Sequence, residues 1–311
     1  MELIRGLQNI RAQHQGCVLT IGNFDGVHVG HQAVLAQLRQ RATELNLPSV
    51  VMVFEPQPLE LFNPQAAPAR LTRFREKYHW LKQQGIDRLL CVKFNRAFAS
   101  QQPSEFIEDL LLNRLGVQHL IVGDDFCFGK NRAGNFAMLQ QASVQHGFGL
   151  TSTASLLKNN QRVSSTLIRE ALAQDQFERA TDMLGREFSL MGRVRHGAKL
   201  GRQLGFPTAN VWLYRKTLPL QGVYAVEAIT KGGRWHGVAN IGSRPTVAGR
   251  VEQLEAHFFD FQGDLYGQQI EVVLKHKIRA EQKFASVDEL QAQIQRDAAA
   301  ARAWFAATAS V

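Results

Sequence analysis

Short apolar runs alternate with longer amphipathic stretches along the first 172 residues of the chain. The apolar runs span residues 17–21, 49–54, 88–94, 119–123 and 149–157. Between them, apolar positions recur three and four residues apart, which predicts helices. These helices span residues 31–45, 73–85, 103–116 and 135–147. Regular alternation of strand and helix predicts an α/β domain with a parallel sheet covered by helices on both faces.

The pattern changes after Gly185. Glycine-rich turns now separate closely spaced stretches in which apolar and polar residues alternate, at residues 222–229, 234–242, 255–261 and 269–278. No helical pattern lies between them, so we expect an antiparallel barrel or sandwich. Only the segment from Ser286 to about Ala306 has helical periodicity. The sequence therefore predicts two different domains, residues 1–184 and 185–311.

Composition agrees with two globular domains. The chain has 311 residues, 45% hydrophobic and 20% charged, which exceeds the usual size of one domain. Cys17, Cys91 and Cys127 are far apart and form no Cys-x-x-Cys pair, so we expect reduced thiols and no zinc site. The N-terminus lacks a signal-peptide pattern, and no apolar run is long enough to span a membrane. We expect a soluble, cytoplasmic protein without a membrane partner.

The net charge of +9 raises the possibility of a nucleic-acid partner. The densest basic segment is Arg186 to Arg202, where five basic residues face one acidic residue and four glycines lie in or just after the segment. Glycines interleaved with basic residues favour a loop that binds a small phosphate over a rigid surface for a duplex. We expect no nucleic acid as the main ligand, and Gly197, Lys199 and Arg202 become candidate phosphate ligands.

The segment Gly22 to His31, GNFDGVHVGH, follows the first buried run. Strand-to-helix connections of this kind carry the ligands of α/β sheets, and glycines allow close approach to a phosphate. His28 and His31 are three residues apart, so they lie on one side of a helical turn and can stabilise charge at an attacked phosphate. The alternatives are a capping pair or a metal site that includes Asp25. A Walker A motif is absent from the sequence.

This segment resembles the H-x-G-H signature of nucleotidyltransferases, in the form found in prokaryotic bifunctional riboflavin kinase/FAD synthetases. Three further stretches match at the spacing of that family, residues 53–58, 122–134 and 163–172. The resemblance implies a Rossmann-like domain in which His28 and His31 are catalytic. It also implies ligands for ATP and its phosphates: Gly22, Phe24, Asp25, Gly30, Ser164, Ser165, Thr166 and Arg169. By itself, the Ser-Ser-Thr segment is typical of a helix N-cap.

Two stretches of the first domain allow other interpretations. Asp124, Asp125 and Phe126 follow the fourth predicted strand, so they either line the site or form an Asx turn. The resemblance favours a flavin site there. The stretch VFEPQP carries Val53 and Gln57 where the family more often has Thr and His, and this leaves the contact made by position 57 open.

In the second domain, residues 192–210 combine a basic, glycine-rich loop with a Pro-Thr-Ala-Asn turn. Thr208 and Asn210 offer hard oxygen ligands for Mg²⁺, although a simple barrel turn has the same composition. The stretch resembles the riboflavin kinase signature, and the segments at 222–226, 237–247, 254–261 and 264–267 follow in family order. The resemblance implies that Thr208 and Asn210 bind Mg²⁺ and ATP phosphates, that Glu255 is the base for the flavin hydroxyl, and that Arg279 neighbours the flavin.

The whole pattern resembles a bifunctional enzyme of flavin cofactor synthesis. The implied substrates and products are riboflavin, FMN, FAD and ATP, with ATP as co-substrate and Mg²⁺ as cofactor. Two alternatives stay open: an enzyme with a single activity and a degenerate second site, or a regulator that binds RNA or flavin without turnover. The sequence does not indicate an oligomeric state.

Overall fold

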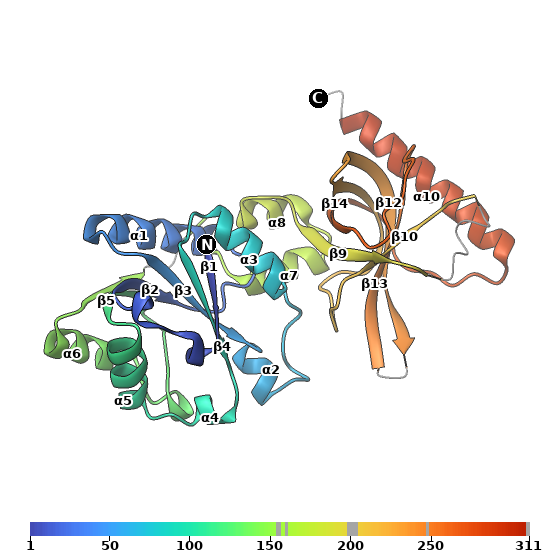
Figure 1. The fold of residues 1–311 in the computed structure, drawn as a ribbon. Helices are drawn as coiled ribbons and strands as arrows, with labels where there is room; N and C mark the ends of the chain where they lie inside the picture. The colour runs from blue at the N-terminus through green and yellow to red at the C-terminus, as the bar shows by residue number, and fades with distance from the viewer. Residues whose placement is uncertain (154–156, 159–160, 198–204, 247–248, 309–311) are drawn as a thin grey trace. The chain divides into compact units, whose positions relative to one another are not determined.

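A computed structural model describes residues 1–153, 157–158, 161–197, 205–246 and 249–308 (Figure 1). The chain forms two compact units. Unit 1 comprises residues 1–68 and 72–164, and unit 2 comprises residues 69–71 and 165–311. Each unit has its own sheet and hydrophobic core.

Unit 1 is built on a six-stranded parallel sheet in the order β1-β4-β3-β2-β5-β6. The strands are β1 (Glu2–Arg5), β2 (Cys17–Ile21), β3 (Ser49–Glu55), β4 (Arg88–Lys93), β5 (Val117–Gly123) and β6 (Gly149–Thr153). The five predicted strands are confirmed, and β1 is an addition at the sheet edge. It has four residues, of which only Ile4 is buried, so it shows no apolar run.

Helices cover both faces of this sheet, as the alternation predicts. Residues alternate along the central strands between two core clusters, so that Val18 and Val51 face one side, and Leu19 and Met52 the other. Helices α1 (Val29–Leu45) and α3 (Phe74–Gln83) cover the first face. The other is covered by α5 (Pro103–Glu105), its π-helical continuation η3 (Phe106–Arg114), and α6 (Phe136–His146) (Figure 1).

Short elements complete unit 1. They are η1 (Leu7–Asn9), η2 (Ala12–His14), α2 (Pro58–Phe62), α4 (Arg96–Ala99), η4 (Lys130–Arg132), β7 (Leu157–Lys158) and β8 (Gln161–Arg162). The strand order places a topological switch between β2 and β5, because the chain continues from β2 to β3 and β4 on one side and returns to β5 and β6 on the other. Ligands of open α/β sheets bind at the carboxyl ends of strands at such a switch.

His119 on β5 links stability of unit 1 to pH. Its Nδ1 accepts a hydrogen bond from Arg41 Nε at 3.2 Å, and its Nε2 lies 2.8 Å from Thr151 Oγ1. Burial, followed by the positive charge of Arg41, lowers the pKa of His119 below its ordinary value of 6.5. The unfolded chain therefore binds this proton more readily than the folded chain does.

We expect the free energy of unfolding to decrease as pH falls below about 6.5, because the folded state resists protonation of His119. Urea unfolding of the wild type and of His119→Gln between pH 5.5 and 7.5 measures this dependence. We expect the free energy of unfolding of His119→Gln to depend less on pH than that of the wild type. An equal slope for the two proteins would show that His119 does not contribute.

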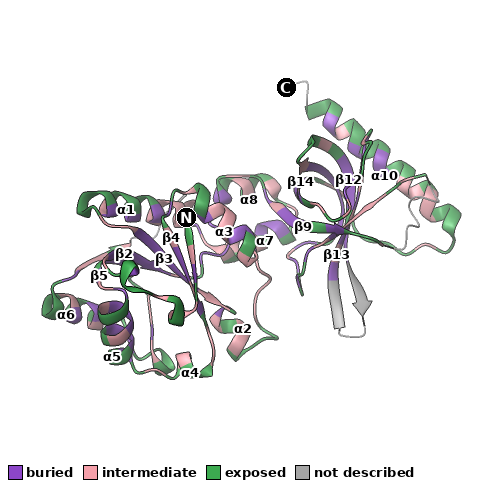
Figure 2. Cartoon of the chain, in the orientation of Figure 1, coloured by how far each residue is buried: buried purple, intermediate pink, exposed green. Residues whose placement is uncertain are grey.

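Unit 2 contains a closed antiparallel barrel in the order β10-β13-β12-β11-β14-β9. The strands are β9 (Ser189–Arg195), β10 (Ala209–Trp212), β11 (Gly222–Thr230), β12 (Gly233–Thr246), β13 (Gly249–Phe258) and β14 (Gln269–Arg279). The predicted C-terminal helix is confirmed as α10 (Val287–Thr308), whose Ala301 and Phe305 pack on Val223 and Val238 of the barrel. Buried residues run along the barrel strands, and most residues of β11 are buried (Figure 2).

Helices α7 (Ser165–Ala173) and α8 (Phe177–Leu184) pack with the barrel unit. Asp175, between these helices, accepts hydrogen bonds from Tyr224 Oη at 3.3 Å and from Lys277 Nζ at 2.6 Å. The compact units thus divide between Ser164 and Ser165, about twenty residues before the boundary expected from the change in sequence pattern. That boundary, at residues 184 and 185, stays a prediction.

Two further expectations concern the whole chain. In the described ranges, no helix has the length and apolar character needed to cross a bilayer. Cys17, Cys91 and Cys127 are all described and all free of disulfides. Burial raises the pKa of the Cys17 thiol to about 12, so this thiol is protonated at neutral pH.

Candidate functional sites

His28 and His31 lie together where the connection from β2 enters α1. His28 is the N-cap residue of α1, and its Nδ1 accepts a hydrogen bond from the backbone N–H of His31 at 3.3 Å. The two imidazole rings stack with their centroids 3.6 Å apart, and the ring of Phe24 lies 4.9 Å from that of His31. Both histidines therefore stand at the positive end of a 17-residue helix, beside the switch point of the sheet.

The N-cap bond selects the tautomer of His28. A nitrogen that accepts a hydrogen bond carries no proton, so the proton of the neutral ring lies on Nε2. His28 as a residue is only 5% exposed. The backbone thus presents Nε2–H of His28 as a donor of fixed orientation.

The connection before the helix adopts an unusual backbone conformation. Phe24 has φ of 46° and Val27 has φ of 44°, although both carry side chains, and both are buried. A β-branched residue rarely occupies this left-handed region, because its side chain clashes with the backbone. Such strain is retained where the surrounding structure requires it, commonly at functional sites.

Asp25 holds this strained segment in place. Its Oδ1 accepts hydrogen bonds from the backbone N–H of Thr72 at 2.9 Å and from Thr72 Oγ1 at 3.1 Å, and Gly26 N donates to Thr72 Oγ1 at 2.9 Å. These bonds make Asp25 an anchor of the loop, and its contact with ATP or its phosphates stays a prediction. In the described ranges, no three His, Cys, Asp or Glu residues cluster as metal ligands.

Gly30 lies close to His28 and to Val163 within unit 1. A methyl group on Gly30 would lie 3.2 Å from Nδ1 and Cε1 of His28 and 3.7 Å from the carbonyl oxygen of Val163. Val163 directly precedes Ser164, the last residue of unit 1. Gly22 is similarly close to Phe24, whose ring would lie 3.2 Å from a methyl group there.

The other members of the Ser-Ser-Thr element belong to unit 2. Ser165 and Thr166 open α7, and Arg169 follows within the same helix. Arg169 Nη1 donates a hydrogen bond to the carbonyl of Ala69 at 3.5 Å. Binding of ATP phosphates by these three residues stays a prediction.

The predicted flavin residues of unit 1 follow β5, the strand beside β2. Asp124 and Asp125 are exposed, and Phe126 stacks on Phe128 with centroids 5.7 Å apart. From Phe128, ring contacts continue through the phenylalanines at 106, 98, 94, 54 and 62. At the end of this row, Phe62 and Leu59 of α2 are 64% and 57% exposed. No pattern in the sequence predicts this exposed apolar surface.

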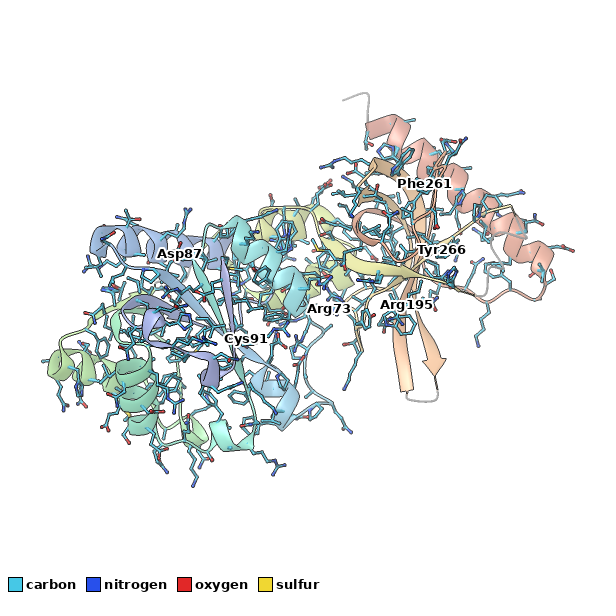
Figure 3. All side chains as sticks on the ribbon, viewed as in Figure 1. Arg73, Asp87, Cys91, Arg195, Phe261 and Tyr266 are labelled. Carbon is cyan, nitrogen blue, oxygen red and sulfur yellow. The ribbon has the colours of Figure 1, made fainter. Side chains whose placement is uncertain are left out.

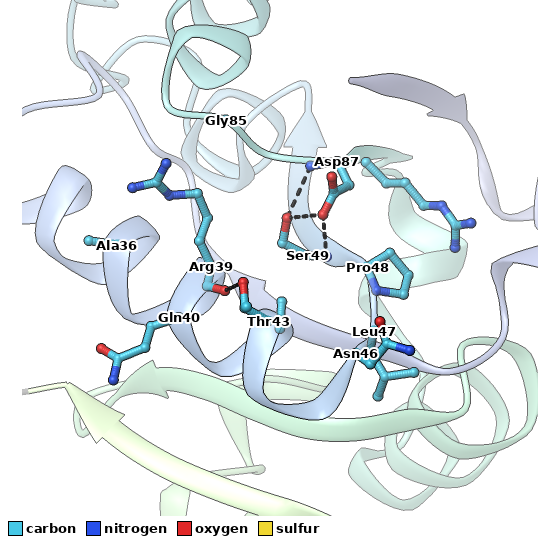
Figure 4. Close-up of a pocket in the computed structure, with 12 residues that line it drawn as sticks. Ala36, Arg39, Gln40, Thr43, Asn46, Leu47, Pro48, Ser49, Gly85 and Asp87 are labelled. Atoms are coloured by element: carbon cyan, nitrogen blue, oxygen red, sulfur yellow. Dashed lines mark hydrogen bonds between the residues drawn. The ribbon is translucent and has the colours of Figure 1, made fainter.

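A separate hollow of about 840 Å³ lies at the opposite end of the strands, where β3 and β4 begin (Figure 4). It is lined by the starts of β3 and β4, where Ser49 Oγ donates to Asp87 Oδ2 at 2.7 Å, and by the end of α1. Because the histidines stand at the carboxyl ends of the strands, this hollow is not part of their site.

The second site lies on the outward face of the barrel. Along β13, Leu254, Ala256 and Phe258 are buried, whereas Glu255 is half-buried and points the other way. Asn210 on β10 and Asn240 on β12 are directly opposite Glu255 in the strand register. Opposite residues of antiparallel strands present their side chains on the same face. The structure therefore brings Asn210 and Glu255 together, as the predicted site requires.

Gly197 makes room for Asn210. A methyl group on Gly197 would lie 2.4 Å from Asn210 Nδ2 and 2.5 Å from its Oδ1. Thr208 immediately precedes β10 and is two residues from Asn210, so the two side chains share a face. The Thr208 hydroxyl makes no hydrogen bond within the described part of the chain, while its neighbour Pro207 accepts one from the His257 ring at 2.9 Å.

We expect Gly197→Ala to lower the rate of the reaction at this second site by about a hundredfold, because Asn210 must move by more than a small relaxation allows. Gly232→Ala is the matched control, since a methyl group there meets only Thr230 Oγ1, at 3.8 Å. Steady-state assays of both variants measure the effect. Equal activity of the two variants would show that the Asn210 position is unimportant.

The basic segment before this site is partly a strand. Arg193 and Arg195 lie on β9, and the guanidinium of Arg195 (Figure 3) lies 5.0 Å from the ring of Trp212 and 5.3 Å from that of Tyr214. Such contacts are cation–π interactions. The loop expected from residue 186 therefore begins only after β9. Lys199 and Arg202, two of its predicted phosphate ligands, lie outside the described residues.

Arg279 ends β14 and is engaged by α10. Its Nε and Nη2 donate to the carboxylate of Asp297 at 2.9 and 2.8 Å, and Asp297 is 4% exposed. In register, Arg279 pairs with Val223, Val223 with Asn240, and Asn240 with Glu255. Arg279 is thus three strands from Glu255 and fastens α10 to the barrel. Its contact with flavin stays a prediction.

Sequence reasoning missed Thr72 and Gln253. Thr72 is 47 residues from Asp25, and no local pattern links the two. Gln253, in contrast, precedes Glu255 by two residues on a strand, which places both side chains on one face. Gln253 Nε2 donates to Asn210 Oδ1 at 2.7 Å and to Glu255 Oε1 at 2.8 Å, and period-two reasoning could have found it.

Two protein-family models match this chain, and each match contains one of the two sites. A model described as FAD synthetase matches residues 10–167, and one described as riboflavin kinase matches residues 184–305. The first match contains both histidines, and the second contains Asn210 and Glu255.

Similar proteins extend over almost the whole chain. A bifunctional riboflavin kinase/FMN adenylyltransferase of Escherichia coli (strain K12) is 54% identical over 310 residues, covering 99% of each chain. Proteins with the same description from Pseudomonas fluorescens and Haemophilus influenzae are 53% and 52% identical, and cover 98% or more of both chains.

Among solved structures, a Streptococcus pneumoniae chain described as a macrolide-efflux protein superposes with a TM-score of 0.79. It is 28% identical, with 96% of this chain and 97% of the other covered. The likeness supports the two-unit fold, and the efflux description belongs to that protein alone. From the two family matches and the full-length identities, the chain belongs to the family of bifunctional riboflavin kinase/FMN adenylyltransferases.

Proposed function

We propose that the histidine loop of unit 1 transfers AMP from ATP to FMN, and that the Asn210–Glu255 face of the barrel phosphorylates riboflavin. The observation that supports the first assignment best is the stacked pair of His28 and His31 at the N-terminus of α1. In the second assignment, the decisive feature is Glu255 directly opposite Asn210.

In the adenylyl transfer, a phosphate oxygen of FMN forms a bond to the α-phosphorus of ATP. The bond between that phosphorus and the α,β-bridging oxygen breaks, and its electron pair leaves with pyrophosphate. His28 Nε2–H donates a hydrogen bond to the phosphate oxygens, and His31 stands beside it. The N-terminal N–H groups of α1 add positive potential, so that charge developing at phosphorus is stabilised.

The flavin ring of FMN has a candidate position on the exposed apolar surface of α2. Phe62 and Leu59 are exposed there, and burial of apolar surface favours contact with a flat aromatic ring. Phe126 lies at the other end of the same row of phenylalanines. Phe126, Asp124 and Asp125 are therefore a second candidate position for the flavin, where the two exposed carboxylates would accept hydrogen bonds from its polar groups.

In the kinase reaction, Glu255 accepts the proton of the riboflavin 5′-hydroxyl. The hydroxyl oxygen forms a bond to the γ-phosphorus, the bond from that phosphorus to the β,γ-bridging oxygen breaks, and ADP leaves with its electron pair. A carboxylate performs this role in other phosphoryl transfers. Gly197 allows the backbone to approach Asn210 closely, and Lys199 and Arg202 are the proposed phosphate ligands.

The donor set of the barrel site fits Mg²⁺. Thr208 and Asn210 supply a hydroxyl and an amide oxygen, which are hard ligands, and Mg²⁺ commonly takes few protein ligands together with water and phosphates. When bound, Mg²⁺ neutralises charge on the phosphates of ATP. Two neighbours fix the side chain of Asn210. The backbone of Gly197 lies close against its amide, and Gln253 Nε2 donates a hydrogen bond to its Oδ1.

Product chromatography tests the proposed function. Purified protein is incubated with ATP and Mg²⁺ and with either riboflavin or FMN. We expect FMN followed by FAD from riboflavin, and FAD from FMN. FMN as the sole product would support the alternative with a single activity. Strongly salt-dependent RNA binding without ATP consumption would instead support a regulator.

A further inference from the structure

Gln253 connects the two central residues of the kinase site. Its Nε2 donates one hydrogen bond to Asn210 Oδ1 at 2.7 Å and another to Glu255 Oε1 at 2.8 Å. A side-chain amide nitrogen carries two protons, so both are used. We propose that Gln253 is a positioning residue for riboflavin phosphorylation, and that its amide fixes the Glu255 carboxylate relative to Asn210. This inference rests on the roles proposed above for those two residues.

The amide of Gln253 has one favourable orientation. Both of its partners are oxygen atoms, and the Glu255 carboxylate only accepts hydrogen bonds when it is ionised. Rotating the amide by half a turn would direct its carbonyl oxygen at these two oxygens. The correct orientation is therefore enforced by repulsion as well as by attraction.

The strand register explains why Gln253 reaches both partners. Gln253 lies opposite Trp212 on β10 and Gly242 on β12, one pleat away from Asn210 and Glu255. The contact with Asn210 is thus a diagonal one, within reach of a long side chain. Trp212 is itself beneath the guanidinium of Arg195, at 5.0 Å from the ring. Gln253 is half-buried, with these residues as its neighbours.

The hydrogen bond from Gln253 holds one carboxylate oxygen of Glu255 in place. Other charged or titratable groups on this outward face, among the described residues, include His257, two residues along β13, and Arg195 and Arg193 on β9, opposite Asn210 and Trp212. The position opposite Glu255 on β12 is the neutral Asn240.

The test compares Gln253→Leu with Gln253→Glu. Leucine removes the donor while keeping most of the volume, and glutamate keeps the shape but adds a like charge. Because a hydrogen bond to a charged group is lost, we expect kcat of riboflavin phosphorylation to fall by about ten- to a hundredfold in Gln253→Leu. KM for riboflavin stays at the wild-type value, as expected when an interaction made only in the transition state is lost, and kcat falls further in Gln253→Glu because of the added like charge.

Two additional readouts separate positioning from general damage. FMN adenylylation reports on the unchanged unit 1 and stays at the wild-type level. Calorimetric binding of a non-hydrolysable ATP analogue with Mg²⁺ becomes weaker, because Asn210 loses its hydrogen-bond donor.

An unchanged kcat would overturn the inference, and so would a loss confined to KM or an equal loss of FMN adenylylation. Failure of the proposed function looks different. If Glu255→Gln retains full kinase activity, the assignment of the base is wrong, whatever Gln253 does. If Glu255→Gln is inactive while Gln253→Leu behaves as wild type, only the positioning role is wrong.

Discussion

The substitution His28→Ala is expected to reduce adenylylation of FMN by about a thousandfold or more, because it removes a preorganised donor at the attacked phosphate. Phosphorylation of riboflavin continues at the wild-type rate, since Glu255 and Asn210 belong to the barrel of the other unit. Separate assays started from FMN and from riboflavin measure the two rates. The reaction started from riboflavin therefore accumulates FMN.

His28 also caps α1 through its Nδ1, so the alanine variant loses about 1 kcal/mol of helix stabilisation as well. His28→Asn is the matched control, because asparagine is an excellent N-cap residue but lacks the imidazole Nε2–H. We expect it to fold with wild-type stability and to remain inactive in adenylylation. Wild-type adenylylation by His28→Asn would mean that position 28 serves only as a cap.

The substitution Glu255→Gln is expected to lower riboflavin phosphorylation by about a hundred- to ten-thousandfold, the usual contribution of a general base. Glutamine keeps the shape of the side chain, and its carbonyl oxygen can still accept the hydrogen bond from Gln253 Nε2. The geometry of the site is thus retained while the base is lost. Adenylylation of added FMN stays unchanged, as measured by FAD formation.

Glu271→Gln is the control for a strand-borne glutamate in the same barrel, because Glu271 lies on β14, away from Asn210. It is expected to keep both activities. Loss of both activities in a folded Glu255→Gln protein would refute the assignment of one site to each unit.

The regular parts of the fold follow from local patterns. Runs such as Cys17–Ile21 and Ser49–Glu55 are buried from both faces of a parallel sheet, which makes them continuously apolar and easy to recognise. Edge strand β1 has only one buried residue, so its sequence shows no apolar run that would predict a strand. Helices α7 and α8 belong with the barrel unit, and Asp175 between them is hydrogen-bonded to Tyr224 and Lys277 of the barrel. Local periodicity does not encode such tertiary contacts.

Residue types at the sites were predictable, but several of their contacts were not. Asp25 is recognisable within its motif, yet its anchoring role depends on Thr72, which is distant in sequence. Arg279 is likewise held by Asp297 of α10. The positive φ angles of Phe24 and Val27 contradict the usual preferences of these residues, so only the folded loop reveals them.

The most direct test of the central claim, that each unit carries one complete site, is a mixture of His28→Ala and Glu255→Gln. Each variant alone is given riboflavin, ATP and Mg²⁺, and then the two are combined. We expect FMN only from the first, unchanged riboflavin from the second, and FAD from the mixture, because FMN made by one variant is adenylylated by the other. FAD from either variant alone, or none from the mixture although Glu255→Gln converts added FMN, would contradict the claim.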